Sequence, residues 1–181
     1  MAIIFTAPDE YRPDIESLPF EGNPIKIFLA GSISGAPDWQ SATLKILEEK
    51  LENDPAIIYN PRQEKFDMNS RAAAARQIAW EFRHLEEMDI FTMYFAASET
   101  SVSPICLYEL GRNICRMQMR FPTDWQRRIL VDIEDGYSRQ QDVIEQVDLA
   151  TGYQVTPIHH SCPEMHAERI YYAVRNIERW W

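Results

Sequence analysis

Two glutamates, Glu81 and Glu109, stand in settings where a carboxyl group can do chemistry. Glu109 lies between apolar residues near an expected helix start, where the helix dipole favours an ionised carboxylate that could act as a nucleophile. Glu81 lies beside the apolar stripe of another expected helix, and a half-buried carboxyl group can have a raised pKa and act as a general acid. Each also has a plainer explanation: an acidic residue in a first helical turn, or a solvated or ion-paired helix charge.

Other candidate chemistries find less support. The turn from Gly31 to Gly35 is neither GxGxxG nor a phosphate loop ending in Gly-Lys-Ser/Thr, which argues against dinucleotide enzymes and NTPases. The cluster of His159, His160, Cys162 and His166 matches neither HExxH nor a zinc finger, so it is best explained as a surface turn. We therefore expect no metal and no organic cofactor.

The elements that position these residues alternate between strands and helices. Short apolar runs predict strands at 25–30, 56–59, 90–95 and 129–133, with a possible fifth at 153–158. Between them, caps and helical spacing predict helices at 38–51, 70–88, 105–117 and 140–149, and a last one from 163. Strands that are apolar on both faces and alternate with helices indicate an α/β fold, with a parallel five-stranded sheet covered on both sides.

The proline-rich residues 1–24 are expected to form an extended N-terminal arm, and residues 25–181 a single domain. In such folds ligands bind beyond the carboxyl ends of the strands. That rule selects the segments 31–35, 60–62, 98–109 and 134–137.

The helix at 70–88 has an apolar stripe of Ala74, Ile78, Phe82 and Leu85. Trp80 is expected on the opposite face, where a large aromatic ring suggests a subunit contact or a wall of the ligand pocket. Asp89 ends this helix, immediately before the third strand.

Composition narrows the function classes. The chain has 181 residues and a formal charge of −10, so a fold this acidic repels a nucleic-acid backbone. Three cysteines without a CxxC pair give no disulfide framework. Since neither a leader nor an apolar run of about 20 residues is seen, we expect a soluble, cytoplasmic protein without membrane contact.

Four blocks together resemble the nucleoside 2-deoxyribosyltransferase family and its relatives that hydrolyse nucleotide N-glycosidic bonds. They are Phe28–Ile33, Trp80-Glu81 with Asp89 eight residues after Glu81, Ser103–Gly111, and Gly136-Tyr137 to Asp142-Val143. The blocks span about 115 residues in the family's order, and the Tyr-Glu-Leu-Gly ending of the third is the most specific.

The resemblance implies a doubly wound, flavodoxin-like domain that performs a double displacement on a 2′-deoxynucleoside. Glu109 falls on the family's nucleophile, which forms a glycosyl-enzyme ester at C1′, and Glu81 falls on the residue that contacts the base. The same blocks imply that Ser103 contacts the 5′ end of the sugar. Further substrate contacts are expected from Gly31, Ser32, Ile33, Trp80, Asp89 and Tyr108.

Four departures from the family pattern bear on mechanism and specificity. Phe28 stands where the family usually has a tyrosine that orients the nucleophile, and Glu81 replaces an aspartate. Ser34 lies near the position where the nucleotide hydrolases have an arginine, and the lack of that arginine disfavours a 5′-phosphate substrate. Ser103 stands in place of an acidic residue, and this change favours a 5′-phosphate substrate.

Base exchange between deoxynucleosides and free nucleobases is therefore the leading hypothesis. The alternatives are hydrolysis of deoxynucleoside 5′-monophosphates and a non-catalytic nucleoside-sensing domain. Trp80, Trp180 and Trp181 also suggest a homo-oligomer with its C-terminal helix near the interface.

Overall fold

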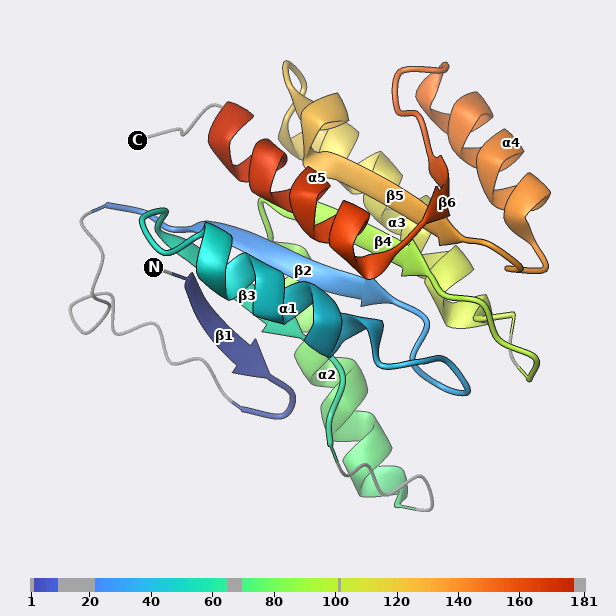
Figure 1. The fold of residues 1–181 in the computed structure, drawn as a ribbon, viewed down its shortest axis with the longest axis horizontal. Coiled ribbons are helices and arrows are strands. Elements are labelled where there is room, and N and C mark those ends of the chain that lie inside the picture. Colours follow the sequence, from blue (N-terminus) through green and yellow to red (C-terminus); the bar gives the residue numbers. More distant parts are fainter. Residues whose placement is uncertain (1, 10–21, 65–69, 101, 178–181) are drawn as a thin grey trace.

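The computed structural model describes residues 2–9, 22–64, 70–100 and 102–177. At its centre is a parallel sheet whose strands are Ala2–Thr6 (β1), Ile25–Gly31 (β2), Ala56–Asn60 (β3), Ile90–Phe95 (β4), Ile129–Glu134 (β5) and Ile158–Ser161 (β6). Every residue of β3 and β4 is buried, as expected of strands covered on both faces. The predicted α/β class is confirmed (Figure 1).

The strand order is β1-β3-β2-β4-β5-β6. Without β1, the remaining five strands follow the doubly wound order 2-1-3-4-5 of flavodoxin-like folds. In this order the chain leaves the sheet in opposite directions after β2 and β4, which opens a crevice between their carboxyl ends.

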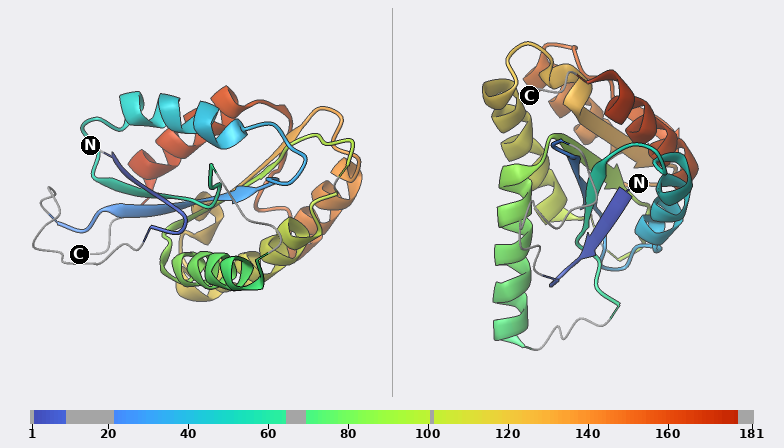
Figure 2. Two further views of the ribbon diagram at one scale, coloured as in Figure 1. Left: turned by 90° about the horizontal axis from the view of Figure 1, so that it is seen from below. Right: turned by 90° about the vertical axis from the view of Figure 1, so that its left-hand side faces the viewer.

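The α-helices that cover the sheet are Trp39–Lys50 (α1), Arg71–Glu87 (α2), Pro104–Arg120 (α3), Gln140–Thr151 (α4) and Pro163–Asn176 (α5). α1 and α5 pack against one face of the sheet, and α2, α3 and α4 pack against the other (Figure 2). Within the described residues, none of these helices combines the length and the apolar character needed to cross a bilayer.

Among the described residues the sheet has six strands, so the prediction of five is corrected. The sixth is β1, which comes from the expected N-terminal arm and pairs with β3 in parallel. The turn that follows β1 keeps contact with the domain, since the backbone N–H of Ala7 donates to the carbonyl oxygen of Asn60 at 3.0 Å. Residues 10–21 of the expected arm lie outside the described residues.

The possible strand predicted at 153–158 is wrong in its position. The last strand, β6, begins at Ile158 and ends at Ser161. β6 is a short edge strand with exposed His159 and His160, and its pairing with β5 is irregular between Ile133 and Glu134. An edge strand of this kind has no continuous apolar run that could mark it in the sequence.

The predicted face of α2 is wrong. Ile78 and Phe82 are 64% and 56% exposed, whereas Trp80 and His84 are buried together with Leu85. The ring of His84 stacks on Tyr59 with the centroids 4.1 Å apart, and Trp80 lies edge-on to it. The sheet below α2 offers aromatic partners, so the helix turns its aromatic residues inward and leaves two apolar side chains outside.

Candidate active site

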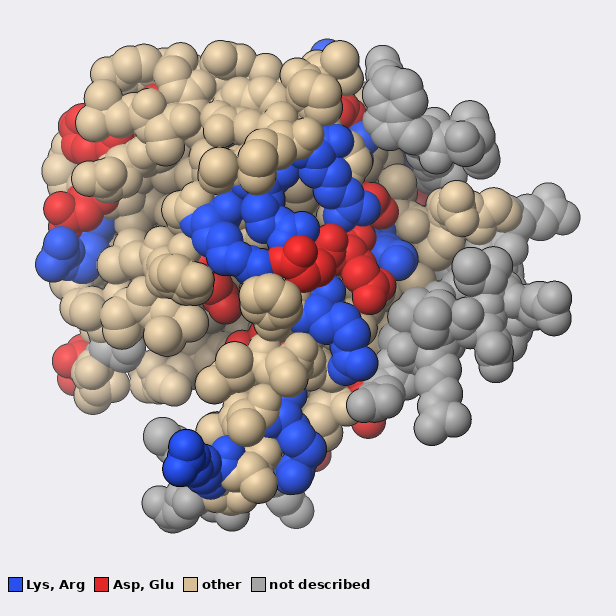
Figure 3. Space-filling view, turned by 180° about the vertical axis from the view of Figure 1, so that it is seen from behind, with Lys and Arg blue, Asp and Glu red and all other residues tan. Residues whose placement is uncertain are grey.

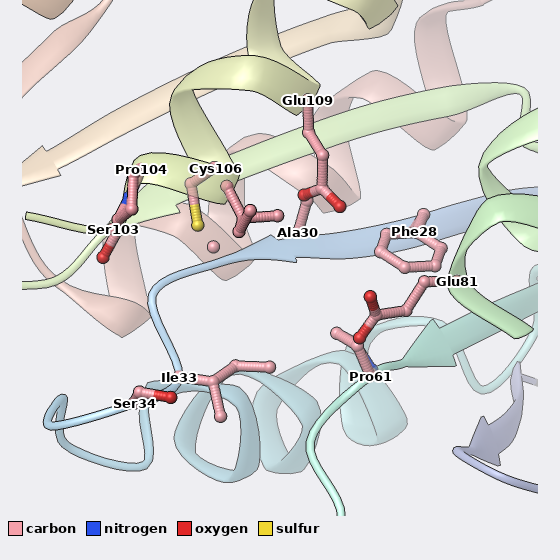
Figure 4. Close-up of a pocket in the computed structure, with 12 residues that line it drawn as sticks. Phe28, Ala30, Ile33, Ser34, Pro61, Glu81, Ser103, Pro104, Cys106 and Glu109 are labelled. Atoms are coloured by element: carbon pink, nitrogen blue, oxygen red, sulfur yellow. The ribbon is translucent and has the colours of Figure 1, made fainter. Parts of the chain in front are cut away.

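A cavity of about 170 Å³ opens at the carboxyl ends of β2 and β3, beside the first turns of α3. Figure 4 shows the residues that line it, which come from β2 and its loop, from the segment after β3, from α2 and from α3. They are Phe28, Ala30, Gly31, Ile33, Ser34, Pro61, Glu81, Ser103, Pro104, Ile105, Cys106 and Glu109. The cavity thus lies in the crevice that the strand order creates.

Glu109 reaches the cavity from α3, and the chemistry of its carboxyl group is set by burial. Burial raises the pKa of Glu109 to about 7, the negative charge of Glu81 adds to the rise, and Arg112 opposes it. Because α3 begins at Pro104, Glu109 lies in the second turn, and the first turn holds no acidic residue. The argument from the helix dipole is therefore weaker than the sequence suggested, since that effect fades beyond the first turn.

Glu81 reaches the same cavity from α2. Burial raises its pKa, and a hydrogen bond from Gln77 opposes the rise. Figure 4 shows the two carboxyl groups pointing toward one another near the ring of Phe28. Two carboxyl groups that sense each other's charge titrate as a pair, and one tends to hold a proton while the other is ionised.

Gln77 is a site residue that the sequence analysis missed. Its amide nitrogen Nε2 donates to Oε1 of Glu81 at 2.6 Å and to the carbonyl oxygen of Pro61 at 2.8 Å. Its own amide oxygen accepts a hydrogen bond from Gln63. A glutamine four residues before a candidate carboxylate on one helix is a signal that could have found it.

An aromatic layer lies behind the cavity. The rings of Phe28 and Trp80 have centroids 6.1 Å apart, and Trp80 is 98% buried. Nε1 of Trp80 donates to the carbonyl oxygen of Asp9 at 2.7 Å, so the turn after β1 fixes the indole. Trp80 does not line the cavity but supports Phe28, which does.

Ser103 precedes α3 and adopts a left-handed conformation with φ of 49°. Its hydroxyl group donates to the hydroxyl oxygen of the buried Ser32 at 2.8 Å, which ties the start of α3 to the loop after β2. The hydroxyl group of Tyr137 donates to the carbonyl oxygen of Val102 at 2.9 Å and supports the same segment. Beside Ser103, burial raises the pKa of the Cys106 thiol to about 12, so this cavity residue stays a neutral thiol.

The last position of β2, just before the loop that follows it, requires glycine. A Cβ atom on Gly31 would lie 2.3 Å from the carbonyl oxygen of Tyr94 and 2.6 Å from the Trp39 ring. Within the loop, Ile33 and Ser34 line the cavity, while Ser32 is buried behind it.

Four residues named from the sequence do not line the cavity: Ser32 and Trp80, which are buried behind it, and Asp89 and Tyr108. Asp89 lies at the amino end of β4, the edge of the sheet opposite the cavity, where its Oδ2 accepts a hydrogen bond from the backbone N–H of Lys26 at 2.9 Å. Tyr108 is 69% exposed on α3 and is not one of the lining residues. Their positions give Asp89 a structural role and leave Tyr108 on the surface.

The histidine and cysteine cluster is spread over separate environments. His166 is fully buried and bonded through Nδ1 to Asp132 at 2.8 Å, whereas His160 pairs with Asp135 at the surface. In the part of the chain that the structure describes, no group of three or more His, Cys, Asp or Glu side chains is arranged to hold a metal ion.

Positive charge gathers away from the cavity. Figure 3 shows arginine and lysine side chains on the face covered by α2 and α3, interleaved with acidic residues. Arg112 and Arg116 both pair there with Glu86. Among the described residues, those that line the cavity include two carboxyl groups and no lysine or arginine.

Comparison with known families agrees with this geometry. Residues 24–124 match the family described as "Nucleoside 2-deoxyribosyltransferase like". The comparison with curated proteins gave no match. The matched segment covers more than half of the chain and contains both Glu81 and Glu109. The chain therefore belongs to the nucleoside 2-deoxyribosyltransferase-like family.

Proposed function

We propose that this chain exchanges the base of a 2′-deoxynucleoside for a free nucleobase, with Glu109 as the nucleophile and Glu81 as the acid and base. The observation that carries the proposal is the meeting of these two carboxyl groups, from α3 and α2, across one cavity at the carboxyl edge of the sheet. Family membership supports an enzyme that acts on nucleosides. One domain would then carry the whole reaction.

The reaction runs in two displacements. In the first, the Glu109 carboxylate attacks C1′ of the sugar, the C1′–N bond breaks with its electron pair passing to the base, and Glu81 delivers a proton to that base. In the second, a ring nitrogen of the incoming base attacks C1′ of the ester, Glu81 takes up the proton of that nitrogen, and the Glu109 carboxylate leaves. A carboxylate suits this task because it stabilises the positive charge that develops at C1′.

The electrostatics of the cavity are consistent with these roles. Burial raises the pKa of both groups, that of Glu109 to about 7, so a proton is available to the two carboxyl groups near neutral pH. Positive charge growing at C1′ favours the ionised form of Glu109, which leaves the shared proton for Glu81 to give to the base.

Charge also supports a substrate without a phosphate group. A 5′-phosphate carries two negative charges near neutral pH, and the described cavity lining offers two acidic groups and no cation to balance them. Arg62, which follows Pro61, is turned to backbone carbonyl oxygens of the loop after β2. We therefore place a free 5′-hydroxyl group near Ser103 and Ser34.

One feature favours the second candidate, hydrolysis of deoxynucleoside 5′-monophosphates. The amino end of α3 lies at the cavity beside Ser103, and helix amino ends attract anions. The two candidates differ in what the Ser103 end of the cavity accepts and in whether water or a base attacks the ester.

The test is an exchange assay with deoxyinosine and adenine, followed by chromatography. We expect both hypoxanthine and deoxyadenosine to appear, and Glu109→Gln to abolish both products. Hypoxanthine without deoxyadenosine would contradict the transferase and favour a hydrolase. The same assay with deoxynucleoside 5′-monophosphates should give much less product, and the reverse order of rates would support the second candidate. Binding of deoxyinosine without any turnover would instead support a non-catalytic nucleoside-sensing domain.

A further inference from the structure

The amide group of Gln77 has only one possible orientation. Gln77 is 92% buried, and its Nε2 faces the carbonyl oxygen of Pro61, which can only accept a hydrogen bond. Turning the amide over would set its oxygen against the oxygens of Pro61 and Glu81. Gln63 donates to the amide oxygen and thereby holds it in place. Both protons of Nε2 are therefore committed, one to Pro61 and one to Glu81.

This orientation makes the two oxygens of the Glu81 carboxyl group unequal. Oε1 lies 2.6 Å from Nε2 of Gln77 and acts as an acceptor. When Glu81 is protonated, the oxygen that accepts from an N–H group takes the carbonyl role, so the proton is carried by Oε2. Since Glu81 lines the cavity, Oε2 is the atom that remains for contact with a ligand there.

Resting on the function proposed above, we infer that Gln77 is a positioning residue that directs Oε2 of Glu81 to the departing and incoming bases. Gln77 itself does not line the cavity. Gln77 acts through Glu81 in two ways. Its hydrogen bond to Oε1 fixes the plane of the Glu81 carboxyl group. The same hydrogen bond favours the ionised form of Glu81 and so opposes the rise in pKa that burial causes.

The groups around Glu81 that titrate or carry charge come from several elements. α3 contributes Glu109, with Cys106 beside it, and both lie across the cavity. The segment after β3 contributes Arg62, whose guanidinium is bound to the loop after β2. β2 contributes Phe28, which carries no charge. Gln77 is thus the neighbour whose hydrogen bond opposes the effect of burial on Glu81.

The experiment follows the titration of Glu81 by carbon NMR in the full chain labelled with ¹³C at the glutamate carboxyl carbons. Glu81→Gln assigns the Glu81 resonance. Gln77→Met has nearly the same length and shape but no donor, so we expect it to raise the titration midpoint of Glu81 by about one pH unit. In the exchange assay, kcat/KM of this variant should fall about tenfold, with the pH profile shifted in the same direction.

The matched control is Gln141→Met on α4. Gln141 donates to Oε1 of Glu145 at 2.7 Å with the same spacing of four residues, but both side chains are exposed and far from the cavity elements. This variant should leave the Glu81 midpoint and the exchange rate unchanged.

Three outcomes settle the inference. An unchanged Glu81 midpoint in a Gln77→Met variant with wild-type melting temperature overturns it. If Gln77→Met does not fold, Gln77→Glu serves in its place. This variant should raise the titration midpoint of Glu81 further, because it sets a second carboxyl group beside Glu81. An unchanged midpoint would again overturn the inference. Because the NMR titration needs no turnover, a shifted midpoint in a chain without base exchange would contradict the proposed function and leave the role of Gln77 towards Glu81 standing.

Discussion

Nη2 of Arg62 donates to the carbonyl oxygen of Ile33 at 3.0 Å. The same guanidinium also donates to the carbonyl oxygens of Ala36 at 2.9 Å and of Pro37 at 2.8 Å. One side chain from the segment after β3 therefore fixes three backbone positions of the loop after β2. Ile33 lines the cavity, so this bracing sets the shape of the cavity wall.

From this relationship we expect Arg62→Met to raise KM for the deoxynucleoside about tenfold, because a charge-assisted hydrogen bond is worth about 1.5–3 kcal/mol. The variant should change kcat much less, because the loop binds the substrate without touching the reacting atoms. Arg62→Lys should not rescue KM, since an ammonium group cannot span several carbonyl oxygens as a guanidinium does. Steady-state kinetics measure both, and an unchanged KM in both variants would contradict the bracing role.

Glu109→Gln should stabilise the protein while it abolishes activity. The pKa of Glu109 in the folded chain is about 7, above its ordinary value of 4.5. Ionisation of Glu109 therefore destabilises the folded state, and this cost grows as the pH rises from 4.5 to 7 and is fully present above that range. The melting temperature of the variant should exceed that of the wild type by a few degrees at about pH 8, and by little at about pH 4.5. Equal melting temperatures at about pH 8 would contradict the raised pKa.

Phe28→Tyr should lower the pKa of Glu109. Phe28 is a cavity residue beside both carboxyl groups, and a hydroxyl group on its ring can donate to an ionised carboxylate, which favours that form. The acidic limb of the pH profile of kcat/KM for base exchange should therefore move to lower pH. The matched variant Phe95→Tyr alters a buried ring that does not line the cavity and should leave that limb in place.

Ser34→Arg should increase activity towards deoxynucleoside 5′-monophosphates relative to deoxynucleosides. Ser34 is an exposed residue at the outer end of the cavity (Figure 4), so an arginine there can reach a 5′-phosphate without displacing buried groups. Competition assays with both substrates measure the ratio, which should rise about tenfold. No change in the ratio would mean that the sugar does not point its 5′ end towards Ser34.

The chain should associate through α2 and α3. Ile78 and Phe82 of α2 are 64% and 56% exposed, and Ile105 of α3 is 64% exposed on the same side of the sheet. Phe82→Glu should therefore reduce the sedimentation coefficient to that of a monomer. The control Tyr172→Glu, on α5 at the other face, should not change it. The reverse result would support the C-terminal helix as the interface, as Trp180 and Trp181 suggested; these two lie outside the described residues.

The prediction from sequence succeeded where burial alone determines structure. The runs at 25–30, 56–59, 90–95 and 129–133 are apolar on both faces, which is typical of strands inside a parallel sheet, and all four are strands in the structure. β1 was missed because its five residues precede a proline-rich stretch and pair with a strand about fifty residues later in the sequence. Pairing over such a distance leaves no local signal.

The candidate site could be predicted only in part, because some of its contacts join segments that are far apart in the sequence. Glu81 and Glu109 could be named because each has an unusual local setting, and the structure places both in one cavity. For Gln77 the sequence holds only its spacing of four residues from Glu81, since its other acceptor, the carbonyl oxygen of Pro61, comes from another element. Asp89 matched the family pattern, and the structure confirms its expected place at the amino end of β4, where it bonds to Lys26 away from the cavity.

The placement of β1 has a consequence for how the chain acquires its shape. β1 lies beside β3, while β2, the next strand in sequence, lies on the far side of β3. During synthesis β1 must therefore wait for residues 56–60 before it can pair, and closing so long a loop makes this a late contact. The indole of Trp80 then gains its acceptor on Asp9. We accordingly expect the order of assembly to be β2, β3 and β4 first and β1 last, so that the wall behind the cavity is the last part to become rigid.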